Sequence, residues 1–247
     1  MDNIRIIGLI FVLVFFFLMV AAAVISRQRG GRKLRGISAF TRLMRAIGLA
    51  VEAGTRLHVS LGRGQPLSTQ SAIGYVGLSI LERIARSTSI SDRPTIATSG
   101  ESSLGILSQD TQRTASKYLG DEFDPMRGRI TGLTPYSYAA GTLTMIQEED
   151  LGANMLIGSY GSEAGLITDA AERSDSMTLG GTDNLSGQAV LFASAQEPLI
   201  GEETYAGGAY LGSGEMHTAS LYAQDILRWV IIALIIIGVI LNLIGVI

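Results

Sequence analysis

The chain of 247 residues contains no cysteine and only two histidines, His58 and His217. Without cysteine the protein can form neither a disulfide framework nor a thiolate zinc site. The two histidines are far apart in the sequence and do not indicate a metal site of their own. We therefore predict no metal ligands and no cofactor.

Three common site motifs are also missing. The sequence has no P-loop G-x-x-x-x-G-K-[ST], no dinucleotide fingerprint G-x-G-x-x-G and no nucleophile elbow G-x-S-x-G. His58 alternates with apolar neighbours and is interpreted first as a core residue, and second as a general base. We predict no catalytic residues, and the sequence favours a protein that is not an enzyme.

Two long apolar stretches lie at the ends of the chain. Neither Ile6–Ile25 nor Val230–Ile247 contains a charged residue. About 20 apolar residues in a helix cross the hydrocarbon layer, and a helix pairs every backbone polar group within it. We therefore predict a transmembrane anchor in residues 1–26 and a second transmembrane helix in residues 226–247.

Five cations follow the first apolar stretch and predict its orientation. By the positive-inside rule, they place the middle of the chain in the cytoplasm at the inner (plasma) membrane, with both termini outside. They also oppose export, so a secretory signal cleaved near Ala21–Ala23 is the less favoured alternative. We expect them to bind anionic lipid of the inner leaflet. These residues are Arg27, Arg29, Arg32, Lys33 and Arg35.

Charge is distributed unevenly along the chain. Residues 27–93 carry 12 Lys+Arg against 3 Asp+Glu, whereas residues 94–228 carry 6 against 18. A basic segment is typical of nucleic-acid binding, but here it adjoins a membrane span and precedes an acidic body that would repel phosphates. We therefore predict no nucleic-acid partner.

Residues 27–47 form a basic juxtamembrane segment with an amphipathic pattern. Its apolar residues recur at helical spacing, as Phe40, Leu43 and Ile47 illustrate, and arginines lie between them. One interpretation is a helix lying in the membrane interface with its apolar face toward lipid. The other is the first core helix of the cytoplasmic domain.

Residues 48–225 are predicted to form one cytoplasmic α/β domain. Short apolar runs, turns and helical patterns alternate along it, which is typical of a Rossmann-like, mostly parallel sheet with helices on both faces. The predicted strands are Leu57–Leu61, Pro94–Thr98, Arg129–Leu133, Ala153–Ile157, Ser176–Leu179 and Ala189–Ala193. Between the last two we expect a short helix at 183–188, and from about Met216 a helix continuous with the second span.

Glycine-rich turns after the strands are the candidate binding residues. In an open parallel sheet, ligands bind beyond the carboxyl ends of the strands, where helix N-termini favour anions. The alternative is that these glycines only make tight turns and close packing. The candidate residues are Gly62, Gly64, Gly158, Gly161 and Ser162.

Three short tracts carry a family resemblance: Leu57–Gly62, Ile200–Glu203 and Ala209–Leu211. In these tracts the chain resembles an uncharacterised family of bacterial membrane proteins with a domain of unknown function flanked by hydrophobic helices. The resemblance covers most of the chain. It implies no assigned activity.

Two functions from different classes follow. The first is a membrane-anchored scaffold that assembles as a homo-oligomer, suggested by complementary basic and acidic parts and by Gly238, Gly245 and Asn242 in the second span. The second is a protein or enzyme that binds a nucleotide or small anion at the glycine-rich turns. Transport is a weaker third hypothesis, because two spans with one polar residue make a poor pathway.

Overall fold

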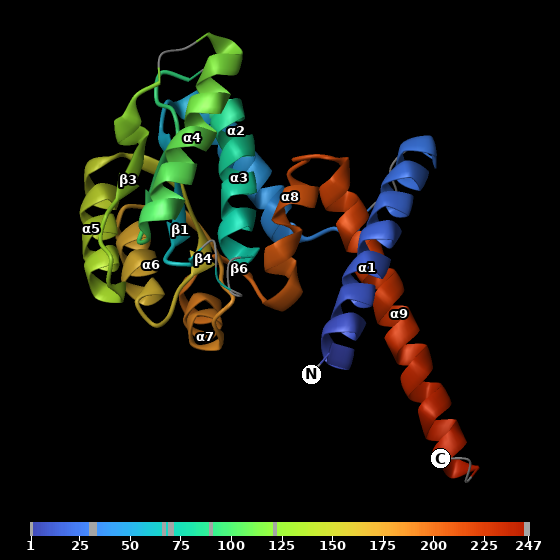
Figure 1. The fold of residues 1–247 in the computed structure, drawn as a ribbon. Helices are drawn as coiled ribbons and strands as arrows, with labels where there is room; N and C mark the ends of the chain where they lie inside the picture. Colours follow the sequence, from blue (N-terminus) through green and yellow to red (C-terminus); the bar gives the residue numbers. More distant parts are fainter. Residues whose placement is uncertain are drawn as a thin grey trace. The chain divides into compact units, whose positions relative to one another are not determined.

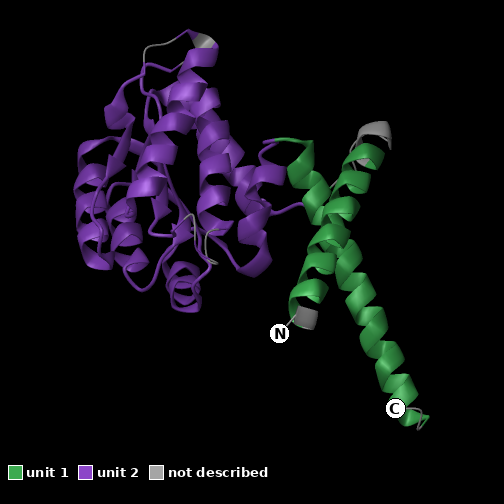
Figure 2. Cartoon of the chain, viewed as in Figure 1, with its two compact units in different colours: residues 1–34, 214–247 green, residues 35–213 purple. Residues whose placement is uncertain are grey.

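The computed structural model describes residues 2–29, 34–65, 68, 72–88, 91–120 and 123–244. The chain divides into two compact units (Figure 2). The helical unit comprises residues 1–34 and 214–247, and the α/β unit comprises residues 35–213.

The helical unit consists of α1 (Asp2–Arg29) and α9 (Glu215–Leu243), which pack against each other (Figure 1). The segment Ile4–Ile25 of α1 and the whole of α9 are long and apolar enough to span a membrane. Most of their large apolar side chains are exposed within the protein, as lipid-facing side chains are. The predicted continuous helix into the second span is confirmed, since α9 is unbroken.

The structure describes three of the five predicted lipid-binding cations. Arg27 and Arg29 lie at the end of α1, and Arg35 forms an ion pair with Glu203 inside the α/β unit. Arg32 and Lys33 lie outside the described residues.

The centre of the α/β unit is a six-stranded sheet in the order β3-β2-β1-β4-β5-β6, with every neighbouring pair parallel. This confirms the predicted α/β fold with a parallel sheet. The order is that of doubly wound dinucleotide-binding folds, in which the chain changes direction across the sheet between β1 and β4. The strands are β1 (Arg56–Gly62), β2 (Ile96–Ser99), β3 (Gly128–Ile130), β4 (Leu151–Ser159), β5 (Met177–Gly181) and β6 (Glu197–Leu199).

Helices cover both faces of the sheet, and two hydrophobic clusters fill the layers between (Figure 1). One face packs against α2 (Ser38–Ala53), α3 (Ala72–Thr88) and α4 (Ser102–Leu119). The other packs against α5 (Pro135–Glu148), α6 (Ala164–Arg173) and α7 (Leu185–Ser194). Short helical turns complete the unit: η1 (Pro125–Arg127), η2 (Gly201–Ala206) and α8 (Gly207–Tyr210).

Helix α2 has the contacts of a core helix, the second of the two interpretations drawn from its sequence. Phe40, Leu43 and Ile47 are buried in the cluster that also contains β1 and α3. Phe40 stacks on Tyr210 with 4.9 Å between ring centroids. Because its apolar stripe is covered by protein, that stripe is not available to lipid.

One predicted strand is wrong. Ala189–Ala193 belongs to α7, where the Asn184 side chain caps the helix by accepting a hydrogen bond from the Ser186 amide. A short apolar run fits a buried strand and a helix equally well, and the cap decides in favour of the helix. The prediction missed β6, whose three residues include Pro198 at the sheet edge. Helix α5 begins with Thr134 as its cap and Pro135 in the first turn.

Candidate functional site

The turns that follow β1 and β4 meet at the carboxyl edge of the sheet, where the strand order reverses. Backbone hydrogen bonds hold the ends of three strands together. The Arg63 amide donates to the Ser159 carbonyl oxygen at 3.2 Å, and the Gly100 amide donates to the Gly62 carbonyl oxygen at 2.8 Å. In folds of this order, ligands bind at this point of the sheet.

Two of the predicted binding residues have an evident packing role. Gly62 has φ +64°, and a Cβ there would lie 2.7 Å from the Ser159 carbonyl oxygen. Gly158, on β4, passes so close to β1 that a Cβ would lie 2.0 Å from the Leu61 carbonyl oxygen. These positions require glycine whether or not a ligand binds there.

The other three predicted residues lie in the two turns themselves. Gly64 is buried just after β1. Gly161 and Ser162 precede α6, and the Ser162 hydroxyl lies 3.5 Å from the Tyr136 hydroxyl. The structure therefore brings all five predicted residues to one end of the β1–β4 pair. Their role in binding stays a prediction.

An arginine and a glutamate face each other at this edge. The Arg63 stem lies on Gly100, where a Cβ would approach it to 2.3 Å, and the Arg63 Nε is 3.9 Å from Glu163 Oε1. Glu163 is only 3% exposed. Arg63 Nε and Glu163 Oε1 are both buried, and no described residue hydrogen-bonds to either atom. Buried polar groups are nearly always satisfied, so this pair calls for a further partner.

Glu163 also determines the charge at the start of α6. Its carboxylate lies against Gly161, with Oε2 2.7 Å from where a Cβ would stand. The positive end of the helix dipole stabilises an anion, and at α6 that anion is the Glu163 carboxylate. The carboxylate makes no capping hydrogen bond to the helix. A phosphate would be repelled from the turn between β4 and α6.

Sequence reasoning missed the pairing of Arg63 with Glu163. Neither residue is among the five predicted binding residues, and nothing in the spacing indicates that Glu163 is buried. The two residues are 100 positions apart in the sequence. Only the adjacency of β1 and β4, which a single sequence does not reveal, brings them together.

A chain of hydrogen-bonded polar side chains crosses the sheet face below this edge. It connects β4, β1 and β2 with α5, and all of its members are at most 1% exposed. In bonding order the side chains are Asn154, His58, Thr98, Tyr138, Ser60 and Tyr160. The chain ends at Tyr160, whose ring packs below Gly62 at the candidate site.

His58 is a satisfied core residue within this chain, the first of its two interpretations. Its Nδ1 is 2.6 Å from Asn154 Oδ1, and its Nε2 is 2.8 Å from Thr98 Oγ1. Because an amide oxygen only accepts, Nδ1 carries the proton and Nε2 accepts from the Thr98 hydroxyl. Burial lowers the pKa of His58 to about 4, and burial raises the pKa of Tyr160 well above its usual range. Both side chains are therefore neutral at physiological pH.

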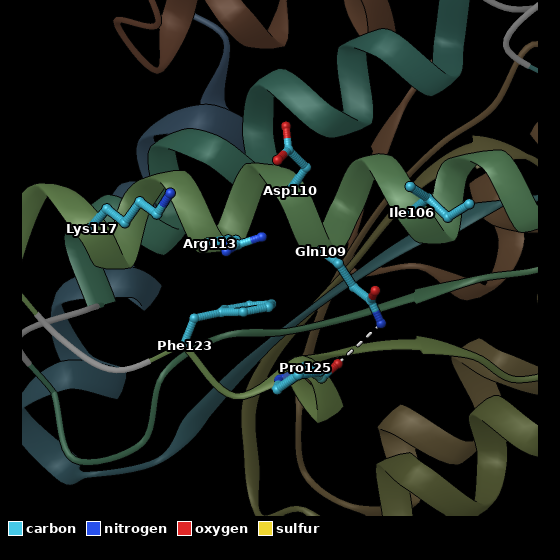
Figure 3. A pocket seen from close by; sticks show the side chains of 7 residues that line it. All are labelled: Ile106, Gln109, Asp110, Arg113, Lys117, Phe123 and Pro125. Carbon is cyan, nitrogen blue, oxygen red and sulfur yellow. Dashed lines mark hydrogen bonds between the residues drawn. The ribbon is translucent and has the colours of Figure 1, made fainter.

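A second feature is a groove of about 670 Å³ on the outer side of α4 (Figure 3). Phe123 and Pro125 form one wall, and Arg113 and Lys117 project from α4 along the other. The Gln109 amide donates hydrogen bonds to the carbonyl oxygens of Pro125 and Gly128, which fixes the far wall to the helix. The groove has room for a small molecule or for side chains of another protein.

In the described part of the chain, no group of three or more histidine, aspartate or glutamate side chains is arranged to bind a metal ion. Several acidic residues pair with arginine instead: Glu149, for example, pairs with both Arg56 and Arg129.

These observations define a class of protein: a doubly wound α/β domain in a chain that also has a pair of apolar helices long enough to span a membrane. The whole chain, residues 1–247, matches DUF6754, a domain of unknown function, and the protein belongs to that family. No curated protein and no solved structure matches it.

Proposed function

We propose that this protein is a membrane-anchored α/β domain that binds a small anionic ligand, such as a mononucleotide, beyond the carboxyl ends of β1 and β4. The observation that carries the proposal is the Arg63–Glu163 pair. Among the described residues, neither Arg63 Nε nor Glu163 Oε1 has a hydrogen-bond partner, although both are buried at the switch point. A ligand that satisfies both atoms would remove an unfavourable term of about 1–3 kcal/mol for each neutral group, and more for charged ones.

The chemistry of the Arg63–Glu163 pair indicates which chemical groups the ligand carries. Arg63 supplies a guanidinium for an anionic group, and the backbone at Gly62 and Gly64 allows close approach. Glu163 accepts from a hydroxyl or amine donor on the same ligand. Because the Glu163 carboxylate lies against Gly161, the anionic group of the ligand belongs on the β1 side, away from Gly161 and Ser162.

The proposal includes a location. The two apolar helices anchor the chain in the inner membrane, the α/β unit lies in the cytoplasm, and both termini lie outside. The support is the length and composition of the helices together with the cations that follow the first one. Arg27, Arg29, Arg32 and Lys33 contact anionic lipid in this arrangement, whereas Arg35 already pairs with Glu203.

Thermal unfolding of the full chain in detergent tests ligand binding. A ligand present at 100 times its Kd stabilises the folded state by about 2.7 kcal/mol, which raises Tm by roughly 5–10 °C for a domain of this size. The panel contains mononucleotides, phosphate and hydroxy acids. We expect Arg63→Gln and Glu163→Gln to abolish the shift, and Arg45→Gln, a change to an exposed arginine on α2, to preserve it. No shift with any compound, or an equal shift in the Arg63 and Glu163 variants, would refute the proposal.

Self-assembly as a scaffold is the second candidate. The supporting observation is that both edges of the sheet expose large apolar side chains, Ile106 and Ile130 near β3 and Leu185 and Phe192 near β6. Such groups are typical of protein interfaces when they occur in contiguous patches. Native mass measurement after gentle extraction tests this candidate, and a monomer at micromolar concentration would exclude it.

A further inference from the structure

Helix α7 carries an apolar stripe that the rest of the α/β unit leaves exposed. Leu185 is 82% exposed and Phe192 is 70% exposed, and Ala189 lies between them on the same face. The helix contains no charged residue. An amphipathic surface helix normally turns polar residues outward, so this stripe is typical of an interaction surface.

The groove on α4 has the complementary character. Its apolar parts are Phe123, Pro125 and Ile106, the last of which is 67% exposed. Arg113 and Lys117 stand one helical turn apart on its rim (Figure 3). In the part of the chain that the structure describes, neither cation has an ion-pair or hydrogen-bond partner.

The stripe and the groove lie at opposite edges of the sheet. Helix α4 packs beside β3, helix α7 packs beside β6, and β3 and β6 are the two outermost strands. A contact between them therefore joins different surfaces of two copies. Contacts of this heterologous kind generate rings or filaments rather than closed two-fold dimers.

The groove is long enough for the α7 stripe of a second copy of this chain, and its cationic rim has the opposite charge to the α/β unit of that copy. At 1.5 Å per residue, the stripe from 185 to 192 is about 10 Å long and the α4 wall from 106 to 117 is about 16 Å long. The α/β unit, residues 35–213, has 13 Lys+Arg against 19 Asp+Glu, so the cationic rim attracts another copy. Asp183, just before the stripe, is placed to meet that rim, although Asp110 also lines the groove and reduces the attraction.

We propose that the α7 stripe of one copy seats in the α4 groove of the next, so that the α/β units assemble head to tail. The inference deepens the scaffold candidate and is independent of ligand binding at the switch point. The neighbour's Leu185 and Phe192 lie along Phe123 and Pro125, and its Asp183 lies near Arg113 or Lys117.

The absence of cysteine allows a direct test in membranes containing the full chain. Cysteines are introduced at Ile106 and at Ala189, which is exposed between Leu185 and Phe192, singly and together, and crosslinked with a short bis-maleimide. We expect the double variant to give a ladder of dimers, trimers and higher species, and each single variant to give monomers. A mixture of the two single variants should give dimers only. A matched double variant at exposed Glu52 and Glu172 reports random collision and should give no ladder.

Each other pattern overturns the proposal. Dimers from Ile106→Cys alone would indicate two-fold pairing of the β3 edges, and dimers from Ala189→Cys alone would indicate pairing of α7 with itself. Labelling of Ala189→Cys by a lipid-phase reagent, without a ladder from the double variant, would show that the membrane covers the stripe. Adding Arg113→Glu and Lys117→Glu to the double variant should reduce the ladder at least tenfold, whereas Arg45→Glu should not.

Discussion

Acid should destabilise the α/β unit through one buried side chain, His58. The unfolded chain binds a proton on this imidazole near pH 6.5, whereas burial lowers its pKa in the folded protein to about 4. Between these two values the unfolded state binds more protons than the folded state. The contribution of neutral His58 to stability is therefore complete above pH 6.5 and is lost progressively as the pH falls toward 4.

The magnitude follows from the shift. A separation of about 2.5 units corresponds to roughly 3 kcal/mol when the whole interval is crossed. Linkage gives a loss of about 2 kcal/mol between pH 7 and pH 5. Since domains of this kind are stable by only about 5–15 kcal/mol, a loss of this size is measurable.

Urea unfolding of the full chain in detergent, followed by far-ultraviolet circular dichroism at pH 7, 6 and 5, measures this loss. Carboxylates also titrate toward pH 5, so the informative quantity is the difference between the native chain and His58→Gln. We expect the variant to lose about 2 kcal/mol less over this range. An identical pH dependence in the native chain and His58→Gln would refute the assignment of a buried neutral imidazole.

Three further outcomes are expected. Gly158→Ala should lower the free energy of unfolding by about 3 kcal/mol or more, because its Cβ would meet the Leu61 carbonyl oxygen at 2.0 Å. Gly48→Ala, whose Cβ would have nothing within 4 Å, should change the free energy of unfolding by at most about 1 kcal/mol. Urea midpoints measure both variants. Thr134→Ala should cost about 1 kcal/mol in the same assay, since it removes the α5 cap. Ser102→Cys should react with an impermeant maleimide only after cells are permeabilised, and labelling of intact cells would place the α/β unit outside.

The alternation of strands and helices could be predicted because each βα unit is encoded locally. Five of the six strands were predicted near their observed positions, each from a short apolar run and a following turn. Parallel strands point their carboxyl ends to one edge of the sheet, so it could be predicted that the glycine turns lie at the same edge even though the strand order was unknown. That order, and with it the position of the switch point, needed the structure.

The side chains of the candidate site were harder to predict, because their significance depends on distant partners. Arg63 and Glu163 are ordinary surface residue types in the sequence. In the described structure they are distinguished by facing each other at the switch point with buried polar atoms that lack a hydrogen-bond partner. The exposure of helix α7 also could not be predicted from its own sequence. The run at 189–193 indicates burial, whereas Phe192 is in fact exposed at the sheet edge.

The buried polar chain accounts for how the sequence places this site. His58 and Ser60 point to one face of β1, and Leu57, Val59 and Leu61 point to the other, since side chains alternate along a strand. A slip of one residue between β1 and β4 would bury His58 among apolar groups and leave the Asn154 side-chain oxygen without a hydrogen-bond donor. Such a slip would cost several kcal/mol. The observed register pairs His58 with Asn154 and Ser60 with Leu156, and it shifts by one residue before Gly62, which lies beside Ser159. The polar residues in the core thus specify the alignment of β1 and β4 as far as Ser60, and the register shift that follows sets the positions of the two turns that form the proposed site.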